Sequence, residues 1–283
     1  MSSESSTNKK SYVFSADEQH SASSCHILAT RLDCTSYDDA CDRIQSLAQS
    51  HQSSYIVAAN VHVVMQAHWQ PEYRHVLKQA TLITPDGMPL VWGICLLCGK
   101  KQSRVYGPDL MIAWCDRASQ SGLSVYLYGS TTDTLTKLSK NLQLRFPDLK
   151  IVGMHSPPFR PLTLAEEAED AQRINDSGAS VVLVGLGCPK QEKWMYRQLG
   201  QTKAVMIGVG AAFRFYSGEV RQAPRWMQRA GLEWLFRLCE EPGRLWKRYV
   251  STNSAFVLLF SLQVMKKELK GIWARMERLR LSS

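Results

Sequence analysis

Residues 180–194 read SVVLVGLGCPKQEKW, and this stretch decides the fold. Its first five residues form a short apolar run without polar alternation, which indicates a strand covered on both faces. A glycine-rich turn follows, and residues 189–199 continue with helical spacing. The order strand, glycine-rich turn and helix is typical of parallel α/β sheets, which bind ligands at the carboxyl ends of their strands.

The same alternation of strand and helix extends over about 170 residues. Other short apolar runs predict strands at residues 54–59, 80–84, 124–128, 150–153 and 203–209. Helical spacing predicts helices at residues 37–49, 61–79, 108–121, 132–146 and 163–177. We therefore expect an α/β fold, with a doubly wound, mainly parallel, Rossmann-like sheet and a helical basic C-terminal appendage.

Positive charge is concentrated near the C-terminus. Residues 221–283 contain 13 Lys and Arg against 5 Asp and Glu, which is +8 of the chain's net +9. Between residues 221 and 249 Arg alternates with Trp, Leu and Phe, and Pro242-Gly243 predicts a break between two helices. Such a segment favours a membrane surface, and the alternative is a docked helix with a solvated basic face.

These features predict three parts. Residues 1–23 are Ser-rich and polar and indicate a flexible tail, residues 24–220 form the catalytic core, and residues 221–283 form a basic, amphipathic, membrane-associating appendage. No signal peptide is visible, and the longest apolar run, residues 255–265, is shorter than the about 20 residues of a spanning helix. We expect a cytoplasmic protein, peripheral at the inner face of the cell membrane.

The eight cysteines are scattered along the chain. A chain of 283 residues can fold without disulfides, so we expect reduced thiols. Cys95 and Cys98 have C-x-x-C spacing, but no second pair follows them, and a redox or metal role has little support.

Polar side chains follow several predicted strands. Asp86 stands in the turn Pro85-Asp86-Gly87, where a partly buried carboxylate can act as a general base. Pro-Asp-Gly is also a common turn sequence, so Asp86 could instead cap the following helix. Asn60 and Gln191 could bind a ligand or satisfy a loop backbone. No cluster of His, Cys and carboxylates has the spacing of metal ligands.

Five motifs stand in one order between residues 25 and 260. They are ITPDG (83–87), RVYGPDL (104–110), VGLGCPKQEKW (184–194), IGVG (207–210), and the run 223–249 with APRWMQ, GLEW and RLWKRY. In this order they resemble the WecG/TagA/CpsF family of bacterial glycosyltransferases (glycosyltransferase family 26).

The resemblance implies an inverting transferase for cell-surface polysaccharide synthesis. The sugar, of N-acetylmannosamine type, a uronic acid or a hexose, would pass from a UDP-sugar to a polyprenyl-diphosphate-linked saccharide, with no metal or other cofactor. An anionic membrane surface is the third implied partner. The resemblance makes Asp86 the base and assigns substrate contacts to Asn60, Arg104, Gln191, Arg237, Arg244 and Lys247.

Two positions depart from the family pattern. Ala58 stands where Thr is common, two residues before Asn60, and Arg214 stands between Phe213 and Phe215 where Asp is common. One departure removes a polar contact and the other inverts a charge. Both bear on the donor sugar, whose identity the sequence leaves open.

Two other classes of function compete with this prediction. A nucleotide-dependent oxidoreductase would use a similar sheet, but G-x-G-x-x-G is absent after the first strand. A nucleic-acid-binding protein would use the basic tail, but its cations are mixed with long apolar faces, which suits lipid better. We therefore expect no nucleic-acid partner, and a homo-oligomer is left open.

Overall fold

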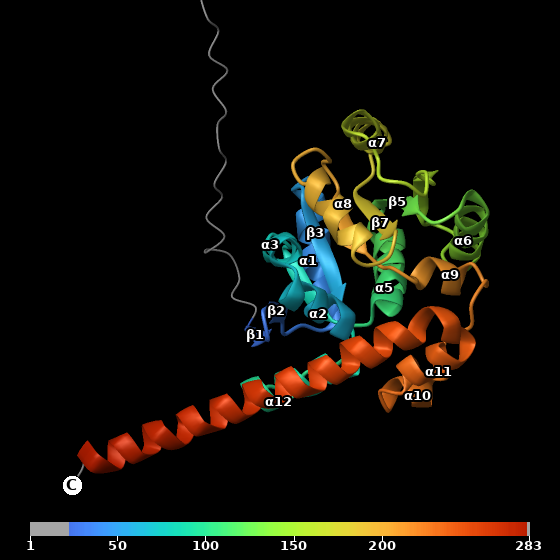
Figure 1. The fold of residues 1–283 in the computed structure, drawn as a ribbon. Helices are drawn as coiled ribbons and strands as arrows, with labels where there is room; N and C mark the ends of the chain where they lie inside the picture. Colours follow the sequence, from blue (N-terminus) through green and yellow to red (C-terminus); the bar gives the residue numbers. More distant parts are fainter. Residues whose placement is uncertain (1–22, 282–283) are drawn as a thin grey trace, which may run out of the picture.

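The computed structural model describes residues 23–281 (Figure 1). The strands are β1 (Ser24–Ile27), β2 (Thr30–Asp33), β3 (Ser54–Ala59), β4 (Leu82–Pro85), β5 (Ser124–Gly129), β6 (Lys150–His155), β7 (Val181–Gly185) and β8 (Val205–Gly208). The helices are α1 (Tyr37–Gln49), α2 (Val61–Trp69), α3 (Pro71–Lys78), α4 (Met88–Cys98), α5 (Gly107–Ser121), α6 (Thr132–Arg145), α7 (Leu164–Asp176), α8 (Lys190–Gln198), α9 (Ala212–Tyr216), α10 (Arg225–Arg229), α11 (Glu233–Glu240) and α12 (Pro242–Leu281).

A six-stranded sheet in the order β4-β3-β8-β7-β5-β6 forms the centre of the protein. Its strands pair in parallel, and β3 pairs with β4 on one side and with β8 on the other. All six predicted strands lie in this sheet, within a residue or two of the expected bounds. The predicted α/β fold with a parallel, Rossmann-like sheet is confirmed.

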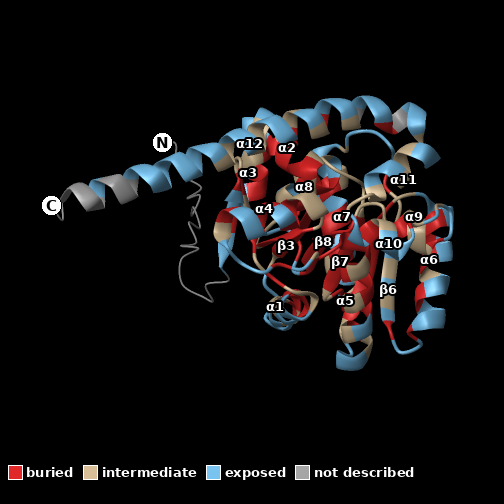
Figure 2. Cartoon of the chain, turned by 90° about the horizontal axis from the view of Figure 1, so that it is seen from below, coloured by how far each residue is buried: buried red, intermediate tan, exposed pale blue. Residues whose placement is uncertain are grey.

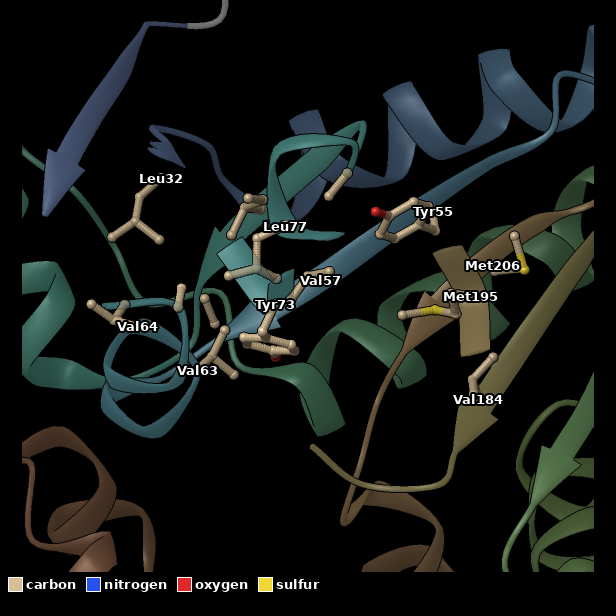
Figure 3. Packing of buried hydrophobic residues seen from close by; sticks show 14 of the residues in the cluster. Leu32, Tyr55, Val57, Val63, Val64, Tyr73, Leu77, Val184, Met195 and Met206 are labelled. Carbon is tan, nitrogen blue, oxygen red and sulfur yellow. The ribbon is translucent and has the colours of Figure 1, made fainter. Parts of the chain in front are cut away.

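Alternate residues of β3, β4, β5, β7 and β8 supply two hydrophobic clusters on opposite faces of the sheet. In β7, Val181 and Leu183 face the cluster that contains α1, α5 and α6, whereas Val182 and Val184 face the one that contains α2, α3 and α8. Figure 3 shows part of the second cluster, where Tyr73 and side chains of α2 lie against β3. Since both faces are covered, these five strands are mainly apolar, as the sequence predicted. The edge strand β6 has no buried residue.

The expected helix 61–79 is wrong as one element. It divides into α2 and α3 at Gln70, whose φ of −117° and ψ of 103° are extended. Pro71 follows, and a proline ring disfavours the helical conformation of the residue before it. The hairpin β1–β2 and helix α4 were not predicted. α4 was missed because its residues are apolar all round, without the one-sided pattern of a surface helix.

Residues 221–281 of the C-terminal segment contain three helices, α10, α11 and α12. The predicted break at Pro242-Gly243 is confirmed, since α11 ends at Glu240 and α12 begins at Pro242. α12 runs along the body past α2 and α4 and ends beyond it (Figures 1 and 2). Gln263 fastens it to the β1–β2 hairpin, accepting a 2.8 Å hydrogen bond from Leu28 N–H and donating one of 2.9 Å to His26 O.

Within the described part of the chain no helix is long and apolar enough to cross a membrane. The expected polar tail, residues 1–23, lies outside the described residues except for Ser23. The division into a core and an appendage at residue 220 stays a prediction, and "appendage" is used below for residues 221–281.

The expectation of reduced thiols throughout is wrong for one pair. Cys25 and Cys98 form a disulfide across 73 residues, with their Cα atoms 6.2 Å apart. The pair forms because the unpredicted strand β1 lies beside the C-terminal end of the unpredicted helix α4. Within the described residues, no disulfide forms at Cys34, Cys41, Cys95, Cys115, Cys188 or Cys239.

Candidate functional site

A cavity of about 1440 Å³ extends along the carboxyl ends of the parallel strands. Its lining includes the residues that directly follow β3, β4, β5, β7 and β8, and α11 and α12 supply further walls. Parallel α/β sheets bind ligands at this edge, because loops and helix N-termini converge there. Asn60, Asp86, Arg104, Gln191 and Arg237 all line this one cavity, although they are widely spaced in the sequence.

Asp86 directly follows β4, and its side chain is 13% exposed. Its Oδ1 accepts a 3.2 Å hydrogen bond from the backbone N–H of Gly107, the first residue of α5. Burial raises the pKa of Asp86 to about 6, against the opposing effect of Arg104. Asp86 does not cap the following helix, because α4 has Gly87 at its N-cap and no side-chain cap.

Arg104 is held beside Asp86 by backbone and side-chain contacts. Val105 N–H donates to Pro85 O at 3.0 Å, which sets this segment against the end of β4. The Arg104 Nε donates to the backbone oxygen of Asp86, and its Nη2 lies 3.7 Å from the Asp86 carboxylate. The same Nη2 lies 2.6 Å from a carboxylate oxygen of Glu233 in α11.

Asn60 and Gln191 both make local hydrogen bonds, which was the alternative to ligand binding. Asn60 caps α2, since its Oδ1 accepts from Val63 N–H at 3.2 Å. Gln191 accepts from Gly187 N–H at 3.1 Å and donates to Glu192 at 2.8 Å. Both residues nevertheless line the cavity, and their substrate contacts stay a prediction.

The three predicted appendage cations lie at different places. Arg237 lines the cavity, with its guanidinium 5.6 Å from the centre of the Phe215 ring. Lys247 is exposed on α12, its ammonium 5.7 Å from the Trp246 ring, and it is not among the described residues that line the cavity. Arg244 lies in the first turn of α12, and its side chain is outside the description.

Both departures from the family pattern line the cavity. Arg214 has two acidic partners, Glu219 at 3.8 Å and Glu241 at 3.4 Å, so its positive charge is balanced locally. Ala58 lies so close to Gly107 that a β-carbon on that glycine would come within 3.1 Å of it. A hydroxyl at residue 58, which Ala58 lacks, would therefore lie at the N-terminal end of α5.

Two residues of this site were missed from the sequence. The Tyr106 ring lies under the Arg104 guanidinium, whose central carbon is 3.9 Å from the ring centre. The Tyr106 hydroxyl donates to Glu233 at 2.8 Å. Glu233 belongs to the motif GLEW, whose only signal was its place in the order of motifs. Among residues 23–281 no three His, Cys, Asp or Glu side chains gather as metal ligands would. Metal independence stays a prediction.

Comparison with known proteins agrees with this geometry. The sequence model of the family described as "Glycosyl transferase WecG/TagA/CpsF family" matches residues 25–270. A relative from Bacillus spizizenii, named N-acetylglucosaminyldiphosphoundecaprenol N-acetyl-beta-D-mannosaminyltransferase, is 34% identical over 203 residues, which cover 71% of this chain and 76% of the relative. A protein of the same name from Bacillus subtilis strain 168 is 33% identical over 215 residues, covering 75% and 79%. The chain therefore belongs to the WecG/TagA/CpsF family and is a glycosyltransferase.

Proposed function

We propose that this glycosyltransferase moves an N-acetylmannosamine-type sugar from a UDP-sugar to a polyprenyl-diphosphate-linked saccharide, with inversion and with Asp86 as the base. The observation that carries the proposal is the Asp86 carboxylate, which lines the cavity, has only 13% of its side chain exposed, and has its pKa raised to about 6. Such a group is largely ionised at neutral pH yet more basic than an ordinary aspartate, as general-base catalysis requires.

The names of the two Bacillus relatives support the choice of substrates. Both are named for an N-acetylmannosaminyl group and for an N-acetylglucosaminyl-diphosphoundecaprenol acceptor. The match to each relative covers more than two thirds of this chain. A uronic acid or hexose donor is the competing choice.

The chemical step is a single displacement. The acceptor hydroxyl oxygen bonds to the anomeric carbon, the bond from that carbon to the UDP oxygen breaks, and the hydroxyl proton passes to the Asp86 carboxylate. The charge that develops on UDP needs donors and cations nearby. Arg237 and Lys193 line the cavity, as does Gly187 just before the N-terminus of α8. Helix N-termini and cations together favour phosphate groups.

We further propose that α12 rests on an anionic membrane surface at the inner face of the membrane. Five of its exposed apolar side chains follow the alternating spacing of four and three residues that one helix face requires: Leu258, Leu262, Met265, Leu269 and Ile272. Lys266 and Lys270 flank this face, and Figure 2 shows how exposed the helix is. Cations beside the stripe favour anionic lipid over a second copy of the same positive helix.

The cavity opens beside this helix. Asn253, Val257 and Ser261 of α12 line the cavity, and Val257 is 63% exposed. A lipid-linked acceptor lying in the membrane surface would therefore reach the cavity along α12. This arrangement accounts for a basic helix next to a site that takes a diphosphate-linked substrate.

A transfer assay tests the substrates. Purified protein is incubated with a polyprenyl-diphosphate-linked N-acetylglucosamine and with UDP-N-acetylmannosamine, UDP-N-acetylglucosamine, UDP-glucose or UDP-glucuronate in turn. We expect the N-acetylmannosamine donor to give the highest kcat/KM and a β-linked product. We also expect EDTA to leave the rate unchanged, because protein cations meet the charge of UDP.

The assay has two contradicting outcomes. A higher kcat/KM with glucose or glucuronate would replace the proposed donor and leave the family intact. A product with the donor's own anomeric configuration would contradict a single displacement with Asp86 as the base, since retention needs two successive inversions.

A further inference from the structure

Glu233 is the acidic side chain that the appendage places beside the proposed base. It is the first residue of α11, and its side chain is only 12% exposed. Its two carboxylate oxygens have separate donors, which are Arg104 Nη2 at 2.6 Å and Tyr106 Oη at 2.8 Å. These partners precede it by 129 and 127 residues, so the contact exists only when α11 is docked on the core.

Arg104 therefore lies between two carboxylates and is shared unequally. Its Nη2 is 2.6 Å from Glu233 but 3.7 Å from Asp86 Oδ1. The Tyr106 ring supports the guanidinium from one side at 3.9 Å, and the backbone oxygen of Asp86 accepts from Nε. The short charge-assisted hydrogen bond of Arg104 thus goes to Glu233, and the Asp86 carboxylate has no close bond to the cation.

The longer distance from Arg104 to Asp86 affects how well the Asp86 carboxylate can accept a proton. A carboxylate in a direct pair with an arginine has its pKa lowered by about one to three units and becomes a poorer proton acceptor. An Asp86 that retains one hydrogen bond, from Gly107 N–H, keeps its remaining lone pairs for the acceptor hydroxyl.

We propose that Glu233 is a positioning residue that holds the Arg104 guanidinium off the Asp86 carboxylate, so that docking of the appendage completes the catalytic base. The inference rests on the proposed role of Asp86. It gives the appendage a positioning role beside the base that is separate from contact with the membrane.

The charged groups around Asp86 give the direction of the effect. Burial makes the largest contribution and raises its pKa, the Arg104 and Arg237 cations lower it, and the Glu233 carboxylate raises it. Tyr106 and Tyr37 also face this group, from the segment before α5 and from α1, and burial raises the pKa of both phenols, so they stay neutral. Without the Glu233 charge Arg104 is free to pair with Asp86, and both changes lower the pKa of Asp86.

The test is the pH profile of kcat/KM for the full chain carrying Glu233→Gln. The wild-type profile should rise through a limb near pH 6, and kcat/KM reports the free enzyme. In Glu233→Gln the limb should move to lower pH by about one unit and the plateau should fall by up to about tenfold, because a weaker base remains. Glu233→Asp keeps the negative charge, so it should partly restore the pH of the limb and the height of the plateau. Glu240→Gln, on the exposed side of the same helix, is the matched control and should change neither.

A second measurement does not depend on turnover. The ¹³C carboxyl resonance of Asp86, identified by its absence in Asp86→Asn, should titrate at lower pH in Glu233→Gln than in wild type. A lower plateau with an unmoved limb and an unmoved resonance would overturn the inference, since it would show only a structural role. If Asp86→Asn is inactive while Glu233→Gln retains the wild-type profile, the inference fails and the base remains. If Asp86→Asn retains full activity, both fail.

Discussion

Asp86→Asn lowers kcat/KM for sugar transfer by a factor of about 10² to 10⁴, which is the usual contribution of a general base. Asparagine has nearly the same shape and can still accept the hydrogen bond from Gly107 N–H, but it cannot take the acceptor proton. The loss should therefore appear in kcat, with the KM for the UDP-sugar changed little. Initial rates over a range of UDP-sugar concentrations separate the change in kcat from the change in KM.

The wild-type rate should also rise with pH through about 6. The pKa of Asp86 is raised from its ordinary value of 3.8 to about 6, so the carboxylate is protonated and inactive below that pH and ionised above it. Asp116→Asn, an exposed position on α5, is the matched control and should retain the wild-type rate and profile. An Asp86→Asn protein with wild-type kcat would remove Asp86 as the base.

Asp86→Asn should at the same time stabilise the protein at neutral pH. Because the folded state raises the pKa of this carboxyl, it binds more protons than the unfolded chain between about pH 4 and 6. The contribution of Asp86 to the free energy of unfolding therefore falls as pH rises through that window, and it is lowest above pH 6. Each unit of pKa corresponds to about 1.4 kcal/mol, so the substitution should raise the free energy of unfolding at pH 7.5 by ~1 to 3 kcal/mol. Urea unfolding of both proteins measures this difference.

The double substitution Leu269→Glu and Ile272→Glu weakens binding to anionic vesicles by about 100-fold. The two side chains are 56% and 50% exposed on the apolar face of α12. Transfer of a leucine or isoleucine out of water is worth about 1.5 to 3 kcal/mol when burial is complete. Two partly buried residues thus contribute about 3 kcal/mol, and each factor of ten in affinity is about 1.4 kcal/mol. The added negative charges repel the lipid further.

Co-sedimentation with vesicles of phosphatidylglycerol and phosphatidylcholine measures this loss. A control protein with Leu144→Glu and Leu164→Glu carries the same charges at two exposed leucines of α6 and α7, and it should still sediment. Wild-type binding should weaken with added salt, because the lysine contribution is screened. Equal sedimentation of the α12 variant and the wild type would contradict the membrane surface proposed for this helix.

Local patterns in the sequence predicted most of the sheet correctly. Strands covered on both faces are continuous apolar runs, and β3 (Ser54–Ala59) was predicted with its observed bounds. α1 also begins and ends where its pattern predicted, and Ser36 and Asp39 form a capping box at its N-terminus. α4 has no such pattern, and it was missed.

The placement of Asp86 at a strand end was also readable, since a polar residue after a buried parallel strand lies at the ligand-binding edge of the sheet. The hydrogen bonds of its neighbours in the cavity could not be predicted from the sequence. Asn60 and Gln191, predicted as substrate contacts, line the same cavity, whereas their hydrogen bonds to Val63 and Gly187 depend on loop conformation.

The sequence by itself thus determined the α/β sheet, the basic C-terminal segment and a strand-end aspartate within five ordered motifs. Only the tertiary structure decided that Cys25 meets Cys98, and that Glu233 of α11 accepts from Arg104 beside Asp86. The physical reason is the range of the interactions. Hydrophobic periodicity and helix caps depend on residues that lie a few positions apart in one segment. The disulfide across 73 residues and the ion pair across 129 residues depend instead on which surfaces pack together.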